Sequence, residues 1–239
     1  MSFAQIINQR RKITMLHTQH EKLMRPLGVA VFLVITLACF NMHLFARGAL
    51  ISDTPDFMAR LQYMQENIIA WRLLWLNWMV SALGLLLFAC MLAHFIHAGF
   101  LRMFGLLLMA LGIAPDISGE CIYAFILPAV QNPTSDQVSS LQLLETIAMN
   151  LTGTVGNGFY NVGGLLLNLL LLQNHKVPKW IVWAGLPAWP LGIALSLATA
   201  LAFYPAAELF TAAAMVWSTL WILLMSLTIF KSPDKFVPA

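Results

Sequence analysis

Six long apolar stretches follow one another along this chain of 239 residues, separated by short polar segments. A helix needs roughly 20 apolar residues to cross a hydrocarbon core about 30 Å thick. The six stretches cover residues 27–46, 68–92, 104–128, 146–170, 180–203 and 208–230. Strands of a transmembrane barrel are excluded, because they would appear as segments of about ten residues with alternating polarity. The sequence therefore predicts an all-α polytopic membrane protein with six transmembrane helices.

The composition also indicates that lipid surrounds this protein. The chain is 60% apolar and 10% charged, whereas a soluble domain is about 45–50% apolar and about 25% charged. A mean hydropathy of +0.78 requires apolar side chains on much of the exterior, which water does not tolerate. The basic residues behind the net charge of +3 are scattered along the chain and form no surface for nucleic acid. The expected partner is the lipid bilayer.

The distribution of Lys and Arg predicts the orientation, because cytoplasmic loops are enriched in basic residues. With the N-terminus inside, the inner side holds Arg10, Arg11, Lys12, Lys22, Arg25, Arg102, Lys176, Lys179, Lys231 and Lys235. The outer side holds only Arg47, Arg60 and Arg72. We therefore expect both termini of the membrane domain to lie in the cytoplasm. Its parts are a cytoplasmic N-terminal segment at 1–25, one transmembrane domain at 26–231 and a cytoplasmic tail at 232–239.

Two carboxyl groups enter the third apolar stretch, in the segment GIAPDISGE at 112–120. Asp116 and Glu120 are four residues apart and share one helix face, beside a proline that frees a backbone carbonyl one turn earlier. A charge at the centre of a membrane helix costs at least about 2.5–3.5 kcal/mol. We therefore expect each carboxyl to have a counter-ion or a functional role. Arg72, near the start of the second stretch, is the expected counter-ion. Because Arg72 can offset only one carboxylate, we expect the other carboxyl to hold a proton that it could carry.

Two further acids, Glu145 and Glu208, stand at the predicted starts of the fourth and sixth helices. The positive end of a helix dipole favours acids at that place. We therefore interpret both as helix-capping residues.

A stripe of amides and glycines follows one face of the fourth apolar stretch. Its members recur every three or four residues and are Asn150, Gly153, Asn157, Asn161, Gly164 and Asn168. Small residues let helices approach closely, and amides can hydrogen-bond across the contact. Several asparagines also suit the wall of a wet cavity, since each amide needs more than one partner. The sequence supports both interpretations, helix packing and a cavity wall.

Tryptophans and prolines mark two other helices. Trp71, Trp75 and Trp78 share one face of the second helix, which is typical of an interfacial aromatic belt and of helix packing, with a ligand-stacking cage as the alternative. Pro187 and Pro190 predict a kink in the fifth helix, where neighbouring groups must satisfy the freed carbonyls.

Motifs of the familiar membrane enzymes are absent from the sequence. There is no G-x-S-x-G, H-E-x-x-H, Walker loop or G-x-G-x-x-G, and no lysine deep within a span. The cysteines lack the spacing of a disulfide framework or a zinc site; they are Cys39, Cys90 and Cys121. Five histidines on the inner side have no carboxylate or cysteine at ligand spacing, namely His17, His20, His94, His97 and His175. We therefore expect no metal and no cofactor.

Three short motifs carry a resemblance. They are WRLLWxxWM at 71–79, DISGE at 116–120 and NGFY at 157–160. Together they resemble motifs of uncharacterised bacterial six-span integral membrane proteins, over less than half of the chain. The resemblance implies a bacterial inner-membrane protein with a single six-helix domain, and it implies no activity.

These observations favour binding or transport of a small molecule or ion through a polar cavity between the second, third and fourth helices. The residues expected to bind the ligand or carry a proton are Arg72, Asp116, Glu120, Asn150, Asn157 and Asn161. One alternative is a structural or accessory protein whose buried charges lock these helices, with another membrane protein or a second copy as partner. Another is an intramembrane enzyme with Asp116 and Glu120 as general acid and base.

Overall fold

A computed structural model describes residues 3–174 and 177–230, and every regular element in these ranges is helical. The long helices are α1 (Phe3–Phe45), α3 (Ile68–His94), α4 (Phe100–Cys121), α5 (Ser135–Met149), α6 (Asn157–Leu171), α8 (Ala188–Ala200) and α9 (Tyr204–Thr228). The short ones are α2 (Phe57–Glu66), α7 (Lys179–Gly185) and the 3-10 turns η1 (Arg47–Ala49) and η3 (Leu127–Ala129). Two π-helices, η2 (Ile122–Ile126) and η4 (Asn150–Gly156), extend α4 and join α5 to α6. The predicted all-α fold class is confirmed.

Five helical segments of the described ranges are long and apolar enough to cross a membrane. They are Lys22–Phe45, Ile68–His94, Phe100–Ala129, Lys179–Ala200 and Tyr204–Thr228. Their outward faces carry leucines that are more than half exposed, such as Leu33, Leu73 and Leu107. An apolar exterior of this kind is compatible with a membrane location.

The predicted fourth helix differs from the expectation in where it begins. The chain is helical from Ser135, eleven residues before the expected start at 146, and continues through η4 to Leu171. A capping box formed by Thr134 and Gln137 starts the helix there. The polar segment 135–145 is thus part of the bundle.

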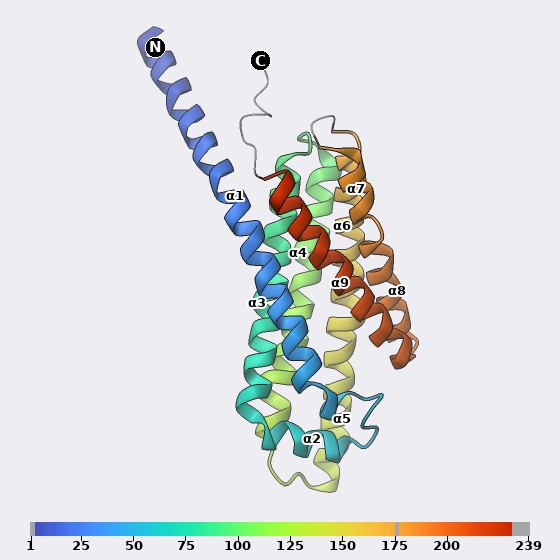
Figure 1. The fold of residues 1–239 in the computed structure, drawn as a ribbon. Coiled ribbons are helices and arrows are strands. Elements are labelled where there is room, and N and C mark those ends of the chain that lie inside the picture. Colours follow the sequence, from blue (N-terminus) through green and yellow to red (C-terminus); the bar gives the residue numbers. More distant parts are fainter. Residues whose placement is uncertain (1–2, 175–176, 231–239) are drawn as a thin grey trace.

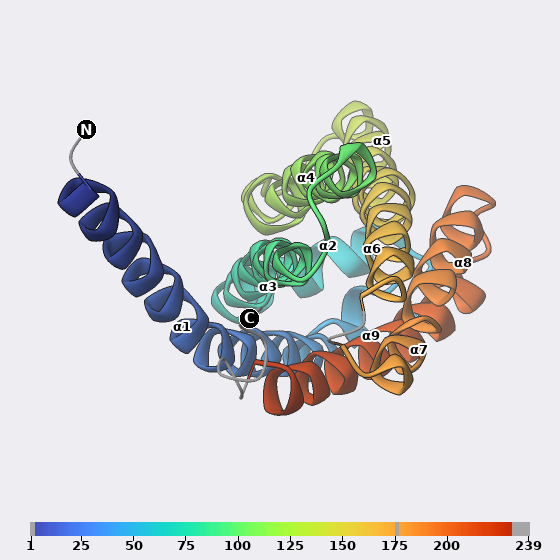
Figure 2. The same ribbon diagram turned by 90° about the horizontal axis from the view of Figure 1, so that it is seen from above.

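The helices run up and down along one bundle axis (Figure 1). α1 begins at the same end at which α9 finishes, and we call this the termini end. η1, α2 and the turn before α5 lie at the opposite end, the α2 end (Figure 1). Viewed along the axis from the termini end, α2 crosses behind the long helices (Figure 2). The predicted segment 1–25 is helical from Phe3 and continuous with α1. His175, Lys176, Lys231, Lys235 and the predicted tail at 232–239 lie outside the described residues.

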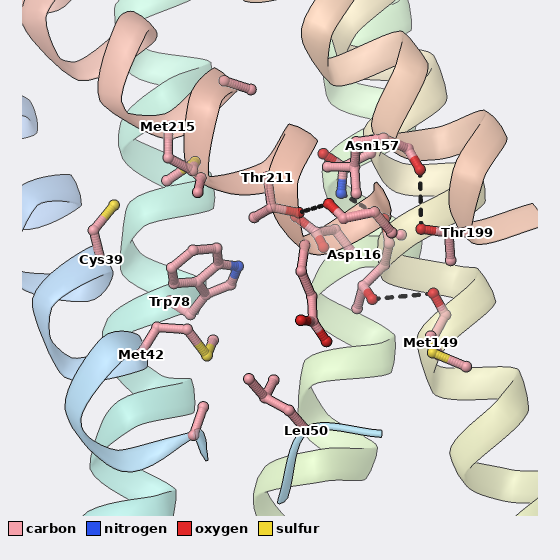
Figure 3. A pocket seen from close by; sticks show the side chains of 18 of the residues that line it. Cys39, Met42, Leu50, Trp78, Asp116, Met149, Asn157, Thr199, Thr211 and Met215 are labelled. Atoms are coloured by element: carbon pink, nitrogen blue, oxygen red, sulfur yellow. Dashed lines mark hydrogen bonds between the residues drawn. The ribbon is translucent and has the colours of Figure 1, made fainter. Parts of the chain in front are cut away.

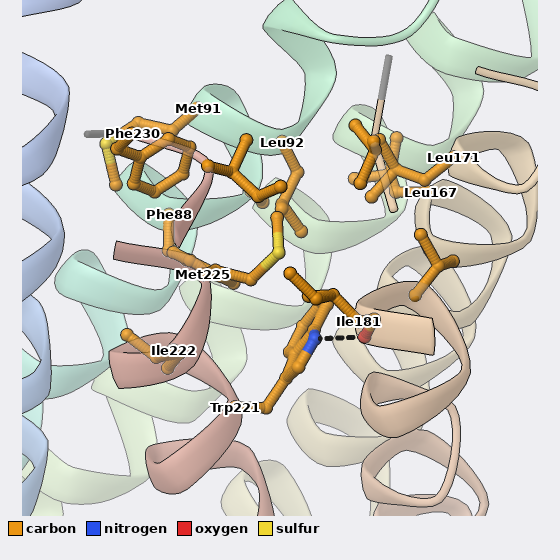
Figure 4. Close-up of a cluster of buried hydrophobic side chains, with 14 of the residues drawn as sticks. Phe88, Met91, Leu92, Leu167, Leu171, Ile181, Trp221, Ile222, Met225 and Phe230 are labelled. Atoms are coloured by element: carbon orange, nitrogen blue, oxygen red, sulfur yellow. Dashed lines mark hydrogen bonds between the residues drawn. The ribbon is translucent and has the colours of Figure 1, made fainter. Parts of the chain in front are cut away.

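An apolar core fills the termini end of the bundle. Phe88 of α3 and Trp221 of α9 meet edge to face with ring centroids 5.4 Å apart, and Leu171 of α6 and Met225 of α9 are fully buried in the same cluster. Figure 4 shows these side chains converging from several helices. This half of the bundle is therefore apolar and closely packed.

The predicted kink in the fifth helix appears as a two-residue interruption within the helical segment Lys179–Ala200. α7 ends at Gly185 and α8 begins at Ala188, with Pro187 between them. The last carbonyls of a helix have no partner within it, and side chains of neighbouring helices satisfy them here. Trp221 Nε1 donates to the Ile181 carbonyl at 2.9 Å, Trp217 Nε1 to that of Ala184 at 2.6 Å and Asn168 Nδ2 to that of Val182 at 3.2 Å.

Glycines bring α4 against the α5–η4–α6 segment. Gly105, Gly112 and Gly119 recur every seven residues along α4. A Cβ added to Gly112 would lie 2.6 Å from the Gly156 carbonyl oxygen and 2.7 Å from the Tyr160 nitrogen. The two backbones therefore touch, which only glycine permits at this position. The stripe glycines Gly153 and Gly164 allow a similar approach to α8, because a Cβ added to either would meet Thr199 or Trp189.

Candidate functional site

A cavity of about 780 Å³ occupies the α2 half of the bundle. Its walls come from the C-terminal part of α1, the N-terminal halves of α3 and α9, the C-terminal part of α4, the region around η4, and α8. Figure 3 shows two unlike sides, with Cys39, Met42 and Trp78 facing Asp116 and Asn157. The cavity is thus amphipathic, and it involves more helices than the three expected.

Asp116 is the carboxyl that the cavity wall presents from within a span. Its residue is only 3% exposed, it lines the cavity, and the described part of the chain gives it no hydrogen bond or ion pair. Local packing fixes its position, because a Cβ on Gly156 would lie 2.9 Å from the Asp116 Cβ. The close contact of α4 with η4 therefore holds this acid at the edge of the cavity.

Glu120 lies one turn further along α4 and is outside the cavity wall. It is fully buried at 0% exposure, and neither carboxyl oxygen has a hydrogen-bond partner among the described residues. The expected pairing with Arg72 is therefore wrong. Arg72 Nε is also buried without a partner. The reason is register, since Trp71 bonds to Tyr123, which sets Arg72 level with η2 and about one turn beyond Glu120.

The asparagines of the stripe differ in their surroundings. Asn157 and Asn161 line the cavity, whereas Asn150 lies outside its wall and bonds to Thr146 and Thr154 on its own helix. Asn157 Nδ2 donates to the Thr152 carbonyl at 2.9 Å, and Asn161 Nδ2 donates to the Asn157 carbonyl at 2.8 Å. These three asparagines use their donors within their own helix segment, whereas Asn168 donates to the Val182 carbonyl of α7.

The π-helix η4 shapes the wall next to Asp116. A π-helix inserts an extra residue per turn and is often found at functional sites. Here it leaves the Thr152 carbonyl to accept from both the backbone and the side chain of Asn157. Asn157 Oδ1 in turn accepts from the Tyr160 hydroxyl at 2.5 Å. This local network fixes Asn157 and Tyr160, both of which line the cavity.

The three tryptophans of α3 all line the cavity. Trp75 stacks on Tyr123 with ring centroids 4.7 Å apart and meets Trp71 edge to face at 5.7 Å. Trp71 Nε1 donates to the Tyr123 carbonyl at 2.8 Å. That carbonyl needs a side-chain donor because the residue five positions later, Pro128 of η3, has no N–H. These contacts position Trp71 and Trp75 on the cavity wall.

A buried ion pair at the α2 end was missed by the sequence analysis. Arg60 of α2 and Glu145 of α5 are each 4% exposed and meet through two contacts, Nε to Oε1 at 3.0 Å and Nη2 to Oε2 at 2.5 Å. Arg60 Nη1 also donates to the Thr54 and Pro55 carbonyls, each at 2.7 Å. Glu145 lines the cavity, so Arg60 neutralises one of its two buried acids.

Glu145 and Glu208 therefore do not cap helices as expected. Glu145 is in the third turn of α5, and Glu208 is in the second turn of α9. Glu208 accepts a hydrogen bond from Ser52 at 2.5 Å, which attaches the segment between η1 and α2 to α9.

The sequence does contain a pattern that predicts helix α2, which carries Arg60. Phe57, Leu61 and Met64 have helical spacing and are buried, and Asp56 caps the helix through the Met58 and Ala59 nitrogens at 3.2 and 3.3 Å.

Within residues 3–174 and 177–230, no three His, Cys, Asp or Glu side chains are grouped so that they could hold a metal ion. Comparison with protein-family models, curated proteins and solved structures found no match for this chain. The proposed function therefore rests on the geometry of the cavity.

Proposed function

We propose that this protein is a six-span protein of the bacterial inner membrane that binds a small molecule in its cavity, as a receptor or as one step of transport. The observation that carries the proposal is the cavity of about 780 Å³ with an unpartnered, buried Asp116 in its wall. Ligand sites have volumes of about 300–1,000 Å³ and combine apolar walls with a few polar groups.

The proposed topology has support from charge and length. α5, η4 and α6 form a helical segment that supplies the sixth span beside the five apolar ones. Arg102 and Lys179 begin helices at the termini end. Basic residues favour the cytoplasmic side, so both termini are cytoplasmic in this proposal and the cavity lies in the outer half of the membrane.

Binding is the step that the cavity supports most directly. The termini half of the bundle is filled by the cluster around Phe88 and Trp221. Passage of a ligand to the cytoplasmic side would require this cluster to open, as in alternating access. Transport therefore needs a second conformation, whereas binding needs only the one described.

A matched pair of substitutions tests the binding proposal. Thr211 of α9 lines the cavity, and Thr228 of the same helix is exposed outside it; both donate to the carbonyl four residues earlier. Small molecules retained by purified protein are released with solvent and measured by mass spectrometry. We expect a molecule that wild type and Thr228→Phe retain and Thr211→Phe loses. Identical contents in all three preparations would contradict the proposal.

Transport has its own test. Uptake of the retained molecule into proteoliposomes is compared for wild type and Asp116→Asn. We expect uptake to fall in the variant, because the unpartnered acid contacts the ligand in this proposal. Unchanged uptake would remove Asp116 from the mechanism.

A structural or accessory role is the second candidate, favoured by the Arg60–Glu145 pair that joins α2 to α5. In that case the partner is another membrane protein or a second copy. Chemical cross-linking in membranes, followed by mass spectrometry, would identify a stoichiometric partner, and an uncross-linked monomer would contradict this role.

A further inference from the structure

The charged side chains around the cavity are unequally distributed between its interior and its rim. The buried acids of the wall are Asp116 and Glu145, and Arg60 neutralises Glu145. The basic residues of the wall, His43 and Arg47, are exposed at the end of α1 and in η1. The buried interior therefore holds one acid, Asp116, that no basic side chain of the described part offsets.

A buried carboxyl without a counter-charge holds a proton until a cation binds beside it. Glu120 lies one turn away on the same helix face and adds a second buried carboxyl without a partner. A cation held at Asp116 would offset this local excess of acids. The Asp116 side of the cavity therefore suits a cationic group.

The opposite side of the cavity is aromatic and apolar. Trp78 and Met42 face Asp116 across the cavity (Figure 3), and Trp75 adds a second indole held by its stack on Tyr123. Tryptophan faces attract cations more strongly than any other side-chain ring, and methionine adapts to varied apolar shapes. The same side therefore suits both a cationic group and the apolar body attached to it.

The size of the cavity excludes a bare ion as the ligand that fills it. At about 30 Å³ per water, a cavity of about 780 Å³ has room for roughly 25 waters. A single metal ion would leave most of this space and its tryptophans unused. An organic molecule fills the volume and contacts both sides.

We infer that the ligand is an organic cation, an amine or onium group on an aromatic or apolar body, with its charge at Asp116 and its body against Trp78 and Met42. This inference rests on the proposed function, because it names the ligand class of the same cavity. It assigns Asp116 as the residue that selects for positive charge.

Two lipophilic ions of similar shape and opposite charge test the inference. Radiolabelled tetraphenylphosphonium and tetraphenylborate are equilibrated by dialysis with full-length protein in lipid nanodiscs, and saturable binding is measured against empty nanodiscs. We expect saturable binding of the cation only. Asp116→Asn should weaken it at least about tenfold, since it removes the buried charge partner. Asp136→Asn, which removes an exposed acid at the start of α5, should leave it unchanged.

The comparison of the two ions in wild type needs no variant, so the test holds even if Asp116→Asn fails to fold. Tetraphenylborate bound as tightly as the cation, or cation binding unchanged in Asp116→Asn, would overturn the choice of a cation. If Thr211→Phe then abolished that binding, the cavity would still be a ligand site. Binding of either ion that persists in Thr211→Phe, or no saturable binding of either ion, would overturn the inference. Binding that persists in Thr211→Phe would place the bound ion outside the cavity, so it would also count against the proposed site. The absence of saturable binding would count against the cation inference alone.

Discussion

Arg60 and Glu145 are 85 residues apart in the sequence and form a buried two-contact ion pair between α2 and α5. The guanidinium also holds the Thr54 and Pro55 carbonyls, and Ser52 of the same segment bonds to Glu208 of α9. The segment between η1 and α2 is thus attached to two helices of the cavity wall. The pair positions a part of the chain whose residues Leu50, Ile51 and Asp53 line the cavity.

Replacing Arg60 by Met should destabilise the protein by about 3–5 kcal/mol, because it leaves Glu145 buried and uncompensated. The measurement is the midpoint of unfolding in detergent, followed by tryptophan fluorescence. Arg60→Met combined with Glu145→Leu should recover most of the loss, since an apolar pair replaces both charges.

Arg72→Met is the matched control for this prediction. Arg72 makes no ion pair in the described ranges, so its removal should cost less than half as much as Arg60→Met. Equal losses for the two variants would contradict the assignment of Arg60 as the structural cation.

Gly112→Ala should destabilise the contact between α4 and the α5–η4–α6 segment by about 1–3 kcal/mol or more, because the new Cβ would meet backbone atoms that cannot move aside. Gly84→Ala is the control within α3, where the nearest atom would be Val31 Cγ1 at 3.5 Å. There the better helix propensity of alanine should make the change neutral or stabilising by up to about 1 kcal/mol. The measurement is the denaturation midpoint of each variant in the same detergent. Equal midpoints would contradict the close backbone contact at Gly112.

Trp71→Phe should cost about 1–3 kcal/mol, because the Tyr123 carbonyl loses its side-chain donor next to Pro128. Trp180→Phe, at a residue 59% exposed on the exterior, should change stability by less than about 0.5 kcal/mol. Thermal unfolding of both variants gives the comparison, and equal midpoints would show that the bond contributes nothing.

A cysteine placed in the cavity should react with a charged maleimide, whereas one on the lipid-facing exterior should not, because the thiolate that reacts forms in water. Thr211→Cys and Val216→Cys, in a background without the three native cysteines, provide the pair on one helix. Thr211 lines the cavity, and Val216 is 61% exposed on the outer face of α9.

In the proposed topology, Thr211→Cys is labelled when the reagent is added to spheroplasts. Labelling only from the cytoplasmic side, in inverted vesicles, would reverse the orientation proposed for the chain. Labelling of Val216→Cys alone would show that the cavity is closed to water.

The sequence analysis identified Asp116, Asn157 and Asn161 as polar groups within apolar helices, and the structure brings all three to one cavity. It also grouped Arg72 and Glu120 with them by depth along the membrane. Residue counts along separate stretches give only approximate depths. The bond from Trp71 to the Tyr123 carbonyl fixes the register of α3 against α4 and sets Arg72 about one turn beyond Glu120.

The length and apolarity of the stretches determined the helical fold, because a chain with so little polar surface must satisfy its backbone within helices. The position of Pro187 likewise determined the interruption of the fifth helix. The tertiary structure alone decided which charges pair. Arg60 finds Glu145 across 85 residues because α2 folds over the bundle, whereas Asp116 is left without a partner at the cavity wall. Pairing depends on distances of a few ångströms between helices, and these follow from side-chain packing that no single helix specifies.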